Sequence, residues 1–337
     1  MAEEQLGFGW EPGGGDSPTA GPQPRIRALA DRLSGFAKRG VYLGTSSWKY
    51  PGWIGSVYDP NRYLARGKLS KKRFEQTCLT EYAGVFPTVG GDFSFYRFPT
   101  ESAWERTFSQ VPEGFRFSLK IPEDITVERF PKLPRYGRRA GRENPDFMNA
   151  ALLEDRFLNL LEPYRSKLGV LMFEFGTIHG ESMKEPKRFA TALDRLLSRL
   201  PTKRFDFSVE VRNRRFLTEG TDYLDSLRSN GVAHCFNSWT RMPSVTDQLG
   251  VSGTFTAKHV VARLLLKPGR TYEQAVKQFS PYDRIGEPYP EGRSALSELI
   301  ETCIEREVGL FAYVNNRFEG NAVETIRAVV NANDLSE

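Results

Sequence analysis

The fold is decided by a stretch that reads LGVLMFEF (168–175), then EPKRFATALDRLLSRL (185–200), then FDFSVEVR (205–212). The outer two segments are short, apolar and rich in β-branched and aromatic residues, which is typical of buried strands. The middle segment repeats apolar residues at the spacing of an amphipathic helix. Two buried strands joined through one helix run parallel and are connected by a right-handed crossover.

The same strand–helix unit repeats along the chain. Helix-period segments follow the expected strands at 71–83, 102–110, 147–164, 185–200, 221–230, 243–249, 293–307 and 321–332. Eight such units close a barrel, whereas a doubly wound open sheet uses about five or six strands. No Gly-rich phosphate fingerprint follows the first strand. We therefore predict an α/β fold, a single (β/α)8 TIM-type barrel, with strands at 41–46, 86–92, 115–120, 168–175, 205–212, 232–238, 260–266 and 308–316.

The first 40 residues are predicted to be an extension, and residues 41–333 the barrel. Residues 1–24 are rich in Gly, Pro, Glu and Gln, so they cannot bury enough apolar surface to order, and we expect them to be disordered. PRIRALADRLSGFAKRG (24–40) has the pattern of a short basic amphipathic helix. Such a helix covers the bottom of the barrel or docks an acidic partner.

The composition limits the class of protein. No run of about 18 apolar residues is present, and the N-terminus lacks the basic start and apolar stretch of a secretory signal. Cys78, Cys235 and Cys303 are far apart and odd in number, which indicates reduced, buried thiols in a cytoplasmic protein without a membrane partner. The net charge of +5 favours anionic partners but does not identify a nucleic-acid binder.

Charged residues end several of the apolar strands. Glu210 is flanked by Val209 and Val211, and Arg212 follows on the same face, while Glu174 and Lys120 end two other strands. The carboxyl ends of barrel strands form the catalytic face, so these side chains are expected to converge there. One interpretation is metal-independent acid–base chemistry on a small anionic or phosphorylated ligand, and the other is a structural ion-pair network.

In the first interpretation the catalytic residues are Glu210 as general base, with Lys120 and Arg212 holding the anion. Further polar and aromatic residues follow the strands and are candidates for ligand binding, although the aromatic ones can equally pack a loop over the barrel. These candidates are Trp48, Tyr50, Asp92, Tyr96, Arg97, Asn237, Arg263, Asn315 and Asn316.

A basic loop after the third strand reads KLPRYGRRAGR (132–142). Its basic residues and neighbouring tyrosine fit a nucleic-acid backbone, and a solvated surface loop is the other interpretation. The basic residues are Lys132, Arg135, Arg138, Arg139 and Arg142.

No metal or other cofactor is predicted. His179, His234 and His259 lie in separate segments, and none has a second histidine at ligand spacing. His234, next to Cys235 in an expected strand, is predicted to be a core histidine. No G-x-S-x-G elbow or Cys–His nucleophile arrangement is present.

Ordered sequence blocks resemble the YecE-like family, which is catalogued as domain of unknown function 72. The resemblance runs from about Val41 to Val330 and implies a TIM-type barrel without an established reaction. It places Trp48, Tyr50, Tyr96, Arg97, Lys120, Glu210, Arg212, Asn315 and Asn316 at the family's aromatic and polar positions. The blocks are GTSSWKYPGWIGSVYDP (44–60), TVGGDFSFYRFPT (88–100), FRFSLKIPEDIT (115–126), KLGVLMFEFG (167–176), SVEVRNRRF (208–216) and YVNNRFEGNAVE (313–324).

The chain departs from the family pattern at several positions. Gly90 and Gly91 stand where the family usually has Glu-Ile, so a carboxylate on the second strand is displaced. Val127, Asn213 and Leu265 occupy positions where the family often has histidine. Whether the chain is an enzyme therefore stays open. A nucleic-acid-associated protein using the basic loop and a catalytically silent barrel that acts as a scaffold are the alternatives.

Overall fold

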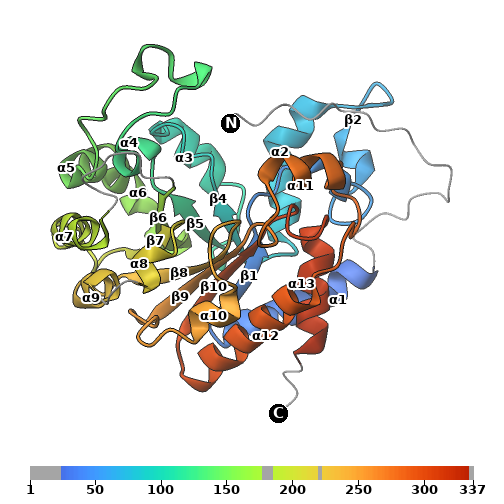
Figure 1. The fold of residues 1–337 in the computed structure, drawn as a ribbon. Helices are drawn as coiled ribbons and strands as arrows, with labels where there is room; N and C mark the ends of the chain where they lie inside the picture. Colours follow the sequence, from blue (N-terminus) through green and yellow to red (C-terminus); the bar gives the residue numbers. More distant parts are fainter. Residues whose placement is uncertain (1–23, 177–184, 219–221, 334–337) are drawn as a thin grey trace.

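The computed structural model describes residues 24–176, 185–218 and 222–333. Its centre is a closed barrel of eight parallel strands, in the order β1-β10-β9-β8-β7-β6-β5-β4 (Figure 1). The predicted (β/α)8 barrel is therefore confirmed. The barrel strands are β1 Val41–Thr45, β4 Thr88–Gly91, β5 Arg116–Lys120, β6 Leu168–Phe175, β7 Asp206–Val211, β8 Ala233–Ser238, β9 His259–Leu264 and β10 Gly309–Val314.

Helices surround the barrel and cover the outer face of its strands (Figure 1). Each of the expected helical segments contains a helix, and the segment 147–164 is divided between α5 and α6 by a π-helical turn at Glu154–Leu158. The helices are α1 Pro24–Lys38, α2 Lys71–Ala83, α3 Glu101–Phe108, α4 Glu123–Thr126, α5 Ala150–Leu153, α6 Asn159–Leu161, α7 Pro186–Leu197, α8 Arg215–Thr218, α9 Asp222–Ser229, α10 Val245–Leu249, α11 Tyr272–Phe279, α12 Pro290–Glu305 and α13 Ala322–Ala332.

The predicted basic helix before the first strand is α1. Its apolar residues Ile26, Leu29, Leu33 and Phe36 are buried, and the helix packs against β1 and α13. Arg32 donates hydrogen bonds to the carbonyls of Val330 and Asn333 at the end of α13. The helix thus belongs to the outer layer of helices. Residues 1–23, which we expect to be disordered, lie outside the described residues.

The strands place alternate residues inside and outside the barrel because their side chains have a period of two. Val170, Met172, Cys235, Val261 and Tyr313 form an apolar group inside it. The other strand residues, among them the valines flanking Glu210, join the larger core between strands and helices. This alternation turns the charged residues at the strand ends inward.

A set of hydroxyl groups lies deeper in the barrel, and we call Thr88, Ser118 and Tyr313 the hydroxyl cluster. The Tyr313 hydroxyl lies 2.6 Å from Ser118 Oγ and 2.9 Å from Thr88 Oγ1. A Cβ atom at Gly90 would lie 2.9 Å from Cγ of Tyr313, so glycine leaves the space that this ring occupies. The Tyr313 ring therefore packs directly against the backbone of β4 at Gly90.

Several short elements do not follow from the sequence pattern. They are the two-stranded sheet of β2 (Leu64–Ala65) and β3 (Lys68–Leu69), and the helices α4, α8 and α11. Cys78, Cys235 and Cys303 are buried free thiols, as predicted. Among the described residues, no helix combines the length and the apolar composition needed to cross a membrane.

Candidate functional site

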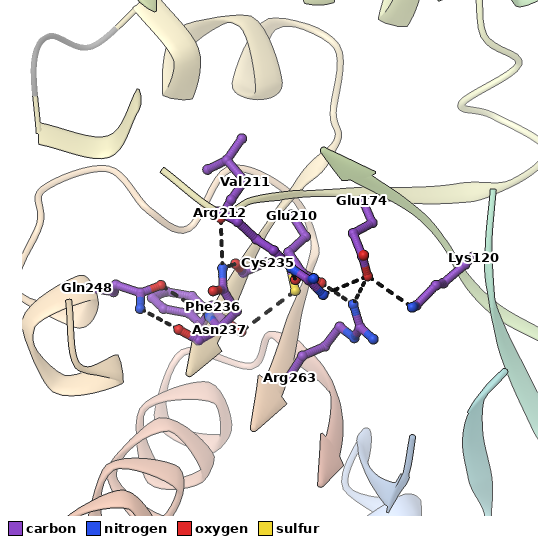
Figure 2. A network of polar contacts seen from close by, with 10 residues as sticks. All are labelled: Lys120, Glu174, Glu210, Val211, Arg212, Cys235, Phe236, Asn237, Gln248 and Arg263. Carbon is purple, nitrogen blue, oxygen red and sulfur yellow. Dashed lines mark hydrogen bonds and ion pairs between the residues drawn. The ribbon is translucent and has the colours of Figure 1, made fainter. Parts of the chain in front are cut away.

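Five charged side chains meet at the carboxyl ends of the barrel strands, and we call them the charged cluster. Lys120 ends β5, Glu174 lies near the end of β6, and Glu210 near the end of β7. Arg212 follows β7 directly, and Arg263 lies near the end of β9. Figure 2 shows the two carboxylates facing the cations from neighbouring strands.

The Glu174 carboxylate is the centre of the charged cluster. Its Oε2 atom lies 2.7 Å from Arg263 Nη1, 2.8 Å from Arg212 Nη2 and 3.0 Å from Lys120 Nζ. Three cations, from the ends of β5 and β9 and from the residue after β7, therefore share one oxygen (Figure 2). Glu174 was recognised as a strand end in the sequence but was not among the candidate site residues.

Glu210 lies beside Glu174, since the two residues are register partners in β7 and β6. Its Oε1 atom accepts a hydrogen bond of 2.7 Å from Nε of Arg212, and its Oε2 atom accepts one from Nη1 of Arg263. The two arginines thus bridge both carboxylates. Like charges on adjacent strands would repel each other without these cations.

The charged cluster is buried. Glu210 is fully inaccessible to solvent, Arg263 is 4% exposed and Lys120 is 8% exposed. Burial alone would raise the pKa of Glu174, but Arg212, Lys120 and Arg263 outweigh it and hold that pKa well below the ordinary value. The three cations therefore hold Glu174 in its anionic form.

The cations outnumber the carboxylates in this buried region. Three positive side chains are directly paired with two negative ones, which leaves an excess of one positive charge within the cluster. The nearby Asp92 acts on Lys120 through its charge but makes no ion pair among the described residues. Nε and Nη2 of Arg263 make no hydrogen bond to any described residue. Excess charge is costly in a low-dielectric interior, so an anion that accepted these donors would stabilise the cluster.

Two predicted ligand-binding residues lie next to the charged cluster. Asp92 is half-buried, and its charge supports the protonated form of Lys120 without an ion pair among the described contacts. Asn237 is the register partner of Arg263, and its side-chain amide donates to the carbonyl of Val211 at 3.1 Å. The Oδ1 atom of Asn237 is buried and has no hydrogen-bond partner among the described residues.

A tryptophan extends the charged cluster toward the rim. The guanidinium of Arg212 stacks on Trp239, with 3.9 Å between Cζ and the ring centroid. Trp239 and Tyr50 both pack against the apolar group of Leu266, Ala275, Phe279 and Tyr282. Trp239 is not among the residues predicted for the site, because nothing in the sequence pairs it with Arg212.

The remaining predicted residues lie apart from the charged cluster. Trp48 packs edge-on against Phe93 and Phe117 in the core. Asn315 Oδ1 accepts from the Arg317 amide, and Asn316 Oδ1 accepts from the Ala322 amide at the start of α13. Tyr96 and Arg97 are exposed. Local contacts thus account for Trp48 and for the Oδ1 atoms of Asn315 and Asn316, whereas the buried Nδ2 atom of Asn316 has no hydrogen-bond partner among the described residues.

The basic loop 132–142 divides into two kinds of residue. Arg135 pairs with Glu123 at 3.2 Å, and Arg139 pairs with Asp124. Arg135 also stacks over Tyr96 at 4.8 Å from the ring centroid. The other basic residues of the loop are exposed and make no ion pair with the described part of the chain; they are Lys132, Arg138 and Arg142.

The two described histidines, His234 and His259, are not part of the charged cluster. His234 is buried, and its Nδ1 atom lies 3.1 Å from the Tyr223 hydroxyl. Burial lowers the pKa of His234 to about 3, so the imidazole is neutral, as expected of a core histidine. His179 lies outside the described residues. Within the described ranges, no group of three or more His, Cys, Asp or Glu side chains is arranged to hold a metal ion.

Comparison with known proteins gives one consistent result. Residues 42–336 match the family model described as protein of unknown function DUF72. The UPF0759 protein YecE of Escherichia coli K12 is 25% identical over 182 residues, which is 54% of this chain and 52% of YecE. The matched region thus spans about half the length of that relative.

Two solved structures of DUF72 family proteins share the fold. The protein from Thermotoga maritima has a TM-score of 0.56 at 18% identity, covering 87% of this chain and 98% of its own. The protein from Enterococcus faecalis has a TM-score of 0.57 at 15% identity, covering 87% of this chain and 96% of its own. At this level of identity the likeness concerns the fold alone.

Proposed function

This chain belongs to the DUF72 family of proteins of unknown function, and we propose that its charged cluster binds a small anion, either a carboxylate or a phosphate. The observation that carries the proposal is the buried excess of one positive charge around Glu174. A bound anion would neutralise that charge and accept hydrogen bonds from Nε and Nη2 of Arg263. Guanidinium groups suit this purpose because their planar donors match both kinds of anion.

The geometry changes the role that we assign to Glu210. Each oxygen of the Glu210 carboxylate accepts a hydrogen bond from a guanidinium, so a substrate proton would compete with an arginine for the same oxygen. We therefore assign Glu210 and Glu174 to positioning: they hold Arg212 and Arg263 at fixed distances inside the barrel. Proton transfer by Glu210 would require a substrate that displaces an arginine.

Anion titration tests this proposal. Calorimetric titration with inorganic phosphate and with acetate should show binding by the unmodified chain. Lys120→Met removes the excess charge without leaving a carboxylate unpaired, since Glu174 keeps both arginines. We expect this variant, and Arg263→Gln, to bind the anions at least about tenfold more weakly.

Arg188→Gln is the matched control, since Arg188 is an exposed arginine paired with Glu185 on the outside of the protein. Its anion affinity should equal that of the unmodified chain. The proposal is wrong if neither anion binds, or if Lys120→Met and Arg263→Gln bind as tightly as Arg188→Gln. Thermal unfolding of each variant at the titration temperature separates lost binding from lost folding.

A second candidate function rests on the surface beside the basic loop. Tyr96 is the large apolar side chain that is exposed among the described residues, and it lies under Arg135. An aromatic side chain beside exposed arginines is suited to single-stranded nucleic acid, because bases stack and phosphates pair with the cations. The three buried free thiols support our proposal that the protein works in a reducing compartment such as the cytoplasm.

Oligonucleotide binding at several salt concentrations tests this second candidate. Neutralising Arg138 and Arg142 together should weaken binding and reduce its salt dependence. The control is neutralising Arg228 and Arg188, which are exposed arginines paired within their own helical turns. Binding that does not depend on salt, or that both double variants retain equally, would exclude the surface.

A further inference from the structure

Lys120 differs from the other residues of the charged cluster because two neighbouring arginines disfavour its positive charge. Its Nζ atom shares Oε2 of Glu174 with two guanidiniums, which are permanently protonated. The residue Lys120 is 8% exposed, and its Nζ atom lies 4.8 Å from the ring centroid of Phe95. Of the three cations, only the lysine can lose its charge, and its loss would restore a neutral cluster.

The groups that face Lys120 determine how readily it gives up a proton. Burial lowers the pKa of Lys120 first, and Arg263 and Arg212 lower it further, while Glu174 and the half-buried Asp92 raise it. The net direction is downward. A desolvated lysine beside other cations is the arrangement that makes an amine nucleophilic at neutral pH.

We propose that Lys120 forms an imine with a small aldehyde or ketone that carries an anionic group. The inference rests on the proposed anion site, because the arginines beside Lys120 would bind the carboxylate or phosphate of the same molecule. Anchoring the anion on Arg263 brings a carbonyl carbon toward the amine that shares the oxygen of Glu174. No other described lysine has two guanidiniums on its own carboxylate partner.

The chemistry balances without an oxidant or a reductant. The lone pair of the neutral Nζ attacks the carbonyl carbon, so a C–N bond forms and the C=O π electrons move to oxygen. That oxygen takes one of the two protons of the amine. The resulting carbinolamine then loses its hydroxyl group as water, as the nitrogen gives up its remaining proton. The products are one imine and one water molecule.

Reductive trapping tests this inference on the full-length chain. The protein is incubated at neutral pH with sodium glyoxylate, an aldehyde with a carboxylate, or with pyridoxal 5′-phosphate, an aldehyde with a phosphate. Cyanoborohydride converts any imine to a stable amine, and peptide mass spectrometry gives the rate for each lysine. The more effective of the two aldehydes identifies the preferred anionic group, and glycolaldehyde serves as the uncharged comparison.

Lys258 is the internal reference, because its side chain is 78% exposed and pairs only with Asp206 and not with a guanidinium. An ordinary lysine that was as buried as Lys120 would react more slowly than Lys258. We expect Lys120 to react at least about tenfold faster. The rate at Lys120 should also level off at lower pH than the rate at Lys258, and phosphate should inhibit it.

Two results would overturn the inference, and they separate it from the anion site. If phosphate binds but Lys120 reacts no faster than Lys258, the imine is wrong and the anion site stands. If phosphate does not bind and Lys120 is unreactive, both proposals fail. Lys120→Arg keeps the charge and should remove the fast adduct. A fast adduct that persists in Lys120→Arg belongs to another lysine and contradicts the assignment.

Discussion

The hydroxyl cluster and the charged cluster both lie inside the barrel, but their buried polar groups are satisfied in different ways. In the lower region, Tyr313, Ser118 and Thr88 are neutral, and their hydroxyls bond to one another and to strand backbone. In the upper region, charges are paired but unequal in number, and donors of Arg263 stay unused. The neutral network satisfies its own hydrogen bonds, whereas the unbalanced one is the region for which we propose a ligand.

The largest expected difference between the two regions comes from removing Glu174. Glu174→Gln leaves three cations facing one carboxylate, and breaking a buried ion pair in this way costs about 3–5 kcal/mol. Denaturant unfolding in a buffer of low anion concentration measures this loss. Phosphate should restore part of the stability, since it would replace the missing negative charge.

Glu143→Gln is the control for that substitution, since Glu143 is 80% exposed and pairs with Arg129 on the surface. Its free energy of unfolding should change by less than about 1 kcal/mol. If Glu174→Gln changed the free energy of unfolding only slightly, and equally with and without phosphate, the charged cluster would not differ from the hydroxyl cluster as its charges indicate.

A smaller effect concerns pH. The pKa of Glu174 is lowered by its three cations despite burial, so its stabilising contribution is complete above the pKa of an unfolded glutamate, about 4.3. It is then lost as the pH falls further, through the lowered pKa of the folded state. The free energy of unfolding of the unmodified chain should fall below about pH 4.3 more steeply than that of Glu174→Gln.

In the lower region, a histidine makes the free energy of unfolding fall on acidification, and this fall begins at a higher pH. His259 lies on the same face of β9 as Arg263 but at the other end; burial lowers its pKa, and Asp206 only partly opposes this. A histidine with a lowered pKa stabilises the fold above about pH 6.5, and this contribution is lost as the pH falls below that value. His259→Gln should flatten the stability curve below about pH 6.5 and leave the region below about pH 4.3 unchanged.

The smallest expected effect comes from the hydroxyl cluster. Tyr313→Phe removes one hydroxyl, while Thr88 still donates to the carbonyl of Arg116 and Ser118 still accepts from the amide of Val170. The cost should be about 1 kcal/mol, and phosphate should neither increase nor reduce it. A loss of phosphate affinity in this variant would mean that the two regions act as one site.

The fold could be predicted from the sequence because each barrel strand carries a short apolar run, and each run is followed by a helical period. The two-residue strands β2 and β3, the four-residue helices α4 and α8, and the eight-residue helix α11 could not be predicted. The two-residue and four-residue elements contain too few residues for a period to appear, whereas α11 is as long as the predicted helices α3 and α9 and was missed for another reason. Tertiary contacts, rather than local pattern, set such elements.

The candidate site was predictable in part. Glu210 and Glu174 carry the same signal, a carboxylate between apolar strand residues, and both lie in the charged cluster. Trp48 and Asn316 carry polar or aromatic groups after strands, yet they serve the core and the start of α13. The sequence shows where a strand ends, but only the closed barrel shows which side chains then point at one another.

The oxygen that Glu174 shares among three cations also restricts how this site can evolve. Replacing any one of Lys120, Arg212 or Arg263 changes the charge that the other two experience. Substitutions at these positions should therefore depend on one another, so that a relative lacking Glu174 is expected to have lost a cation as well. Within the family, the residues of the charged cluster should then change in pairs. A relative in which only one of them has changed is expected to have lost the proposed anion binding.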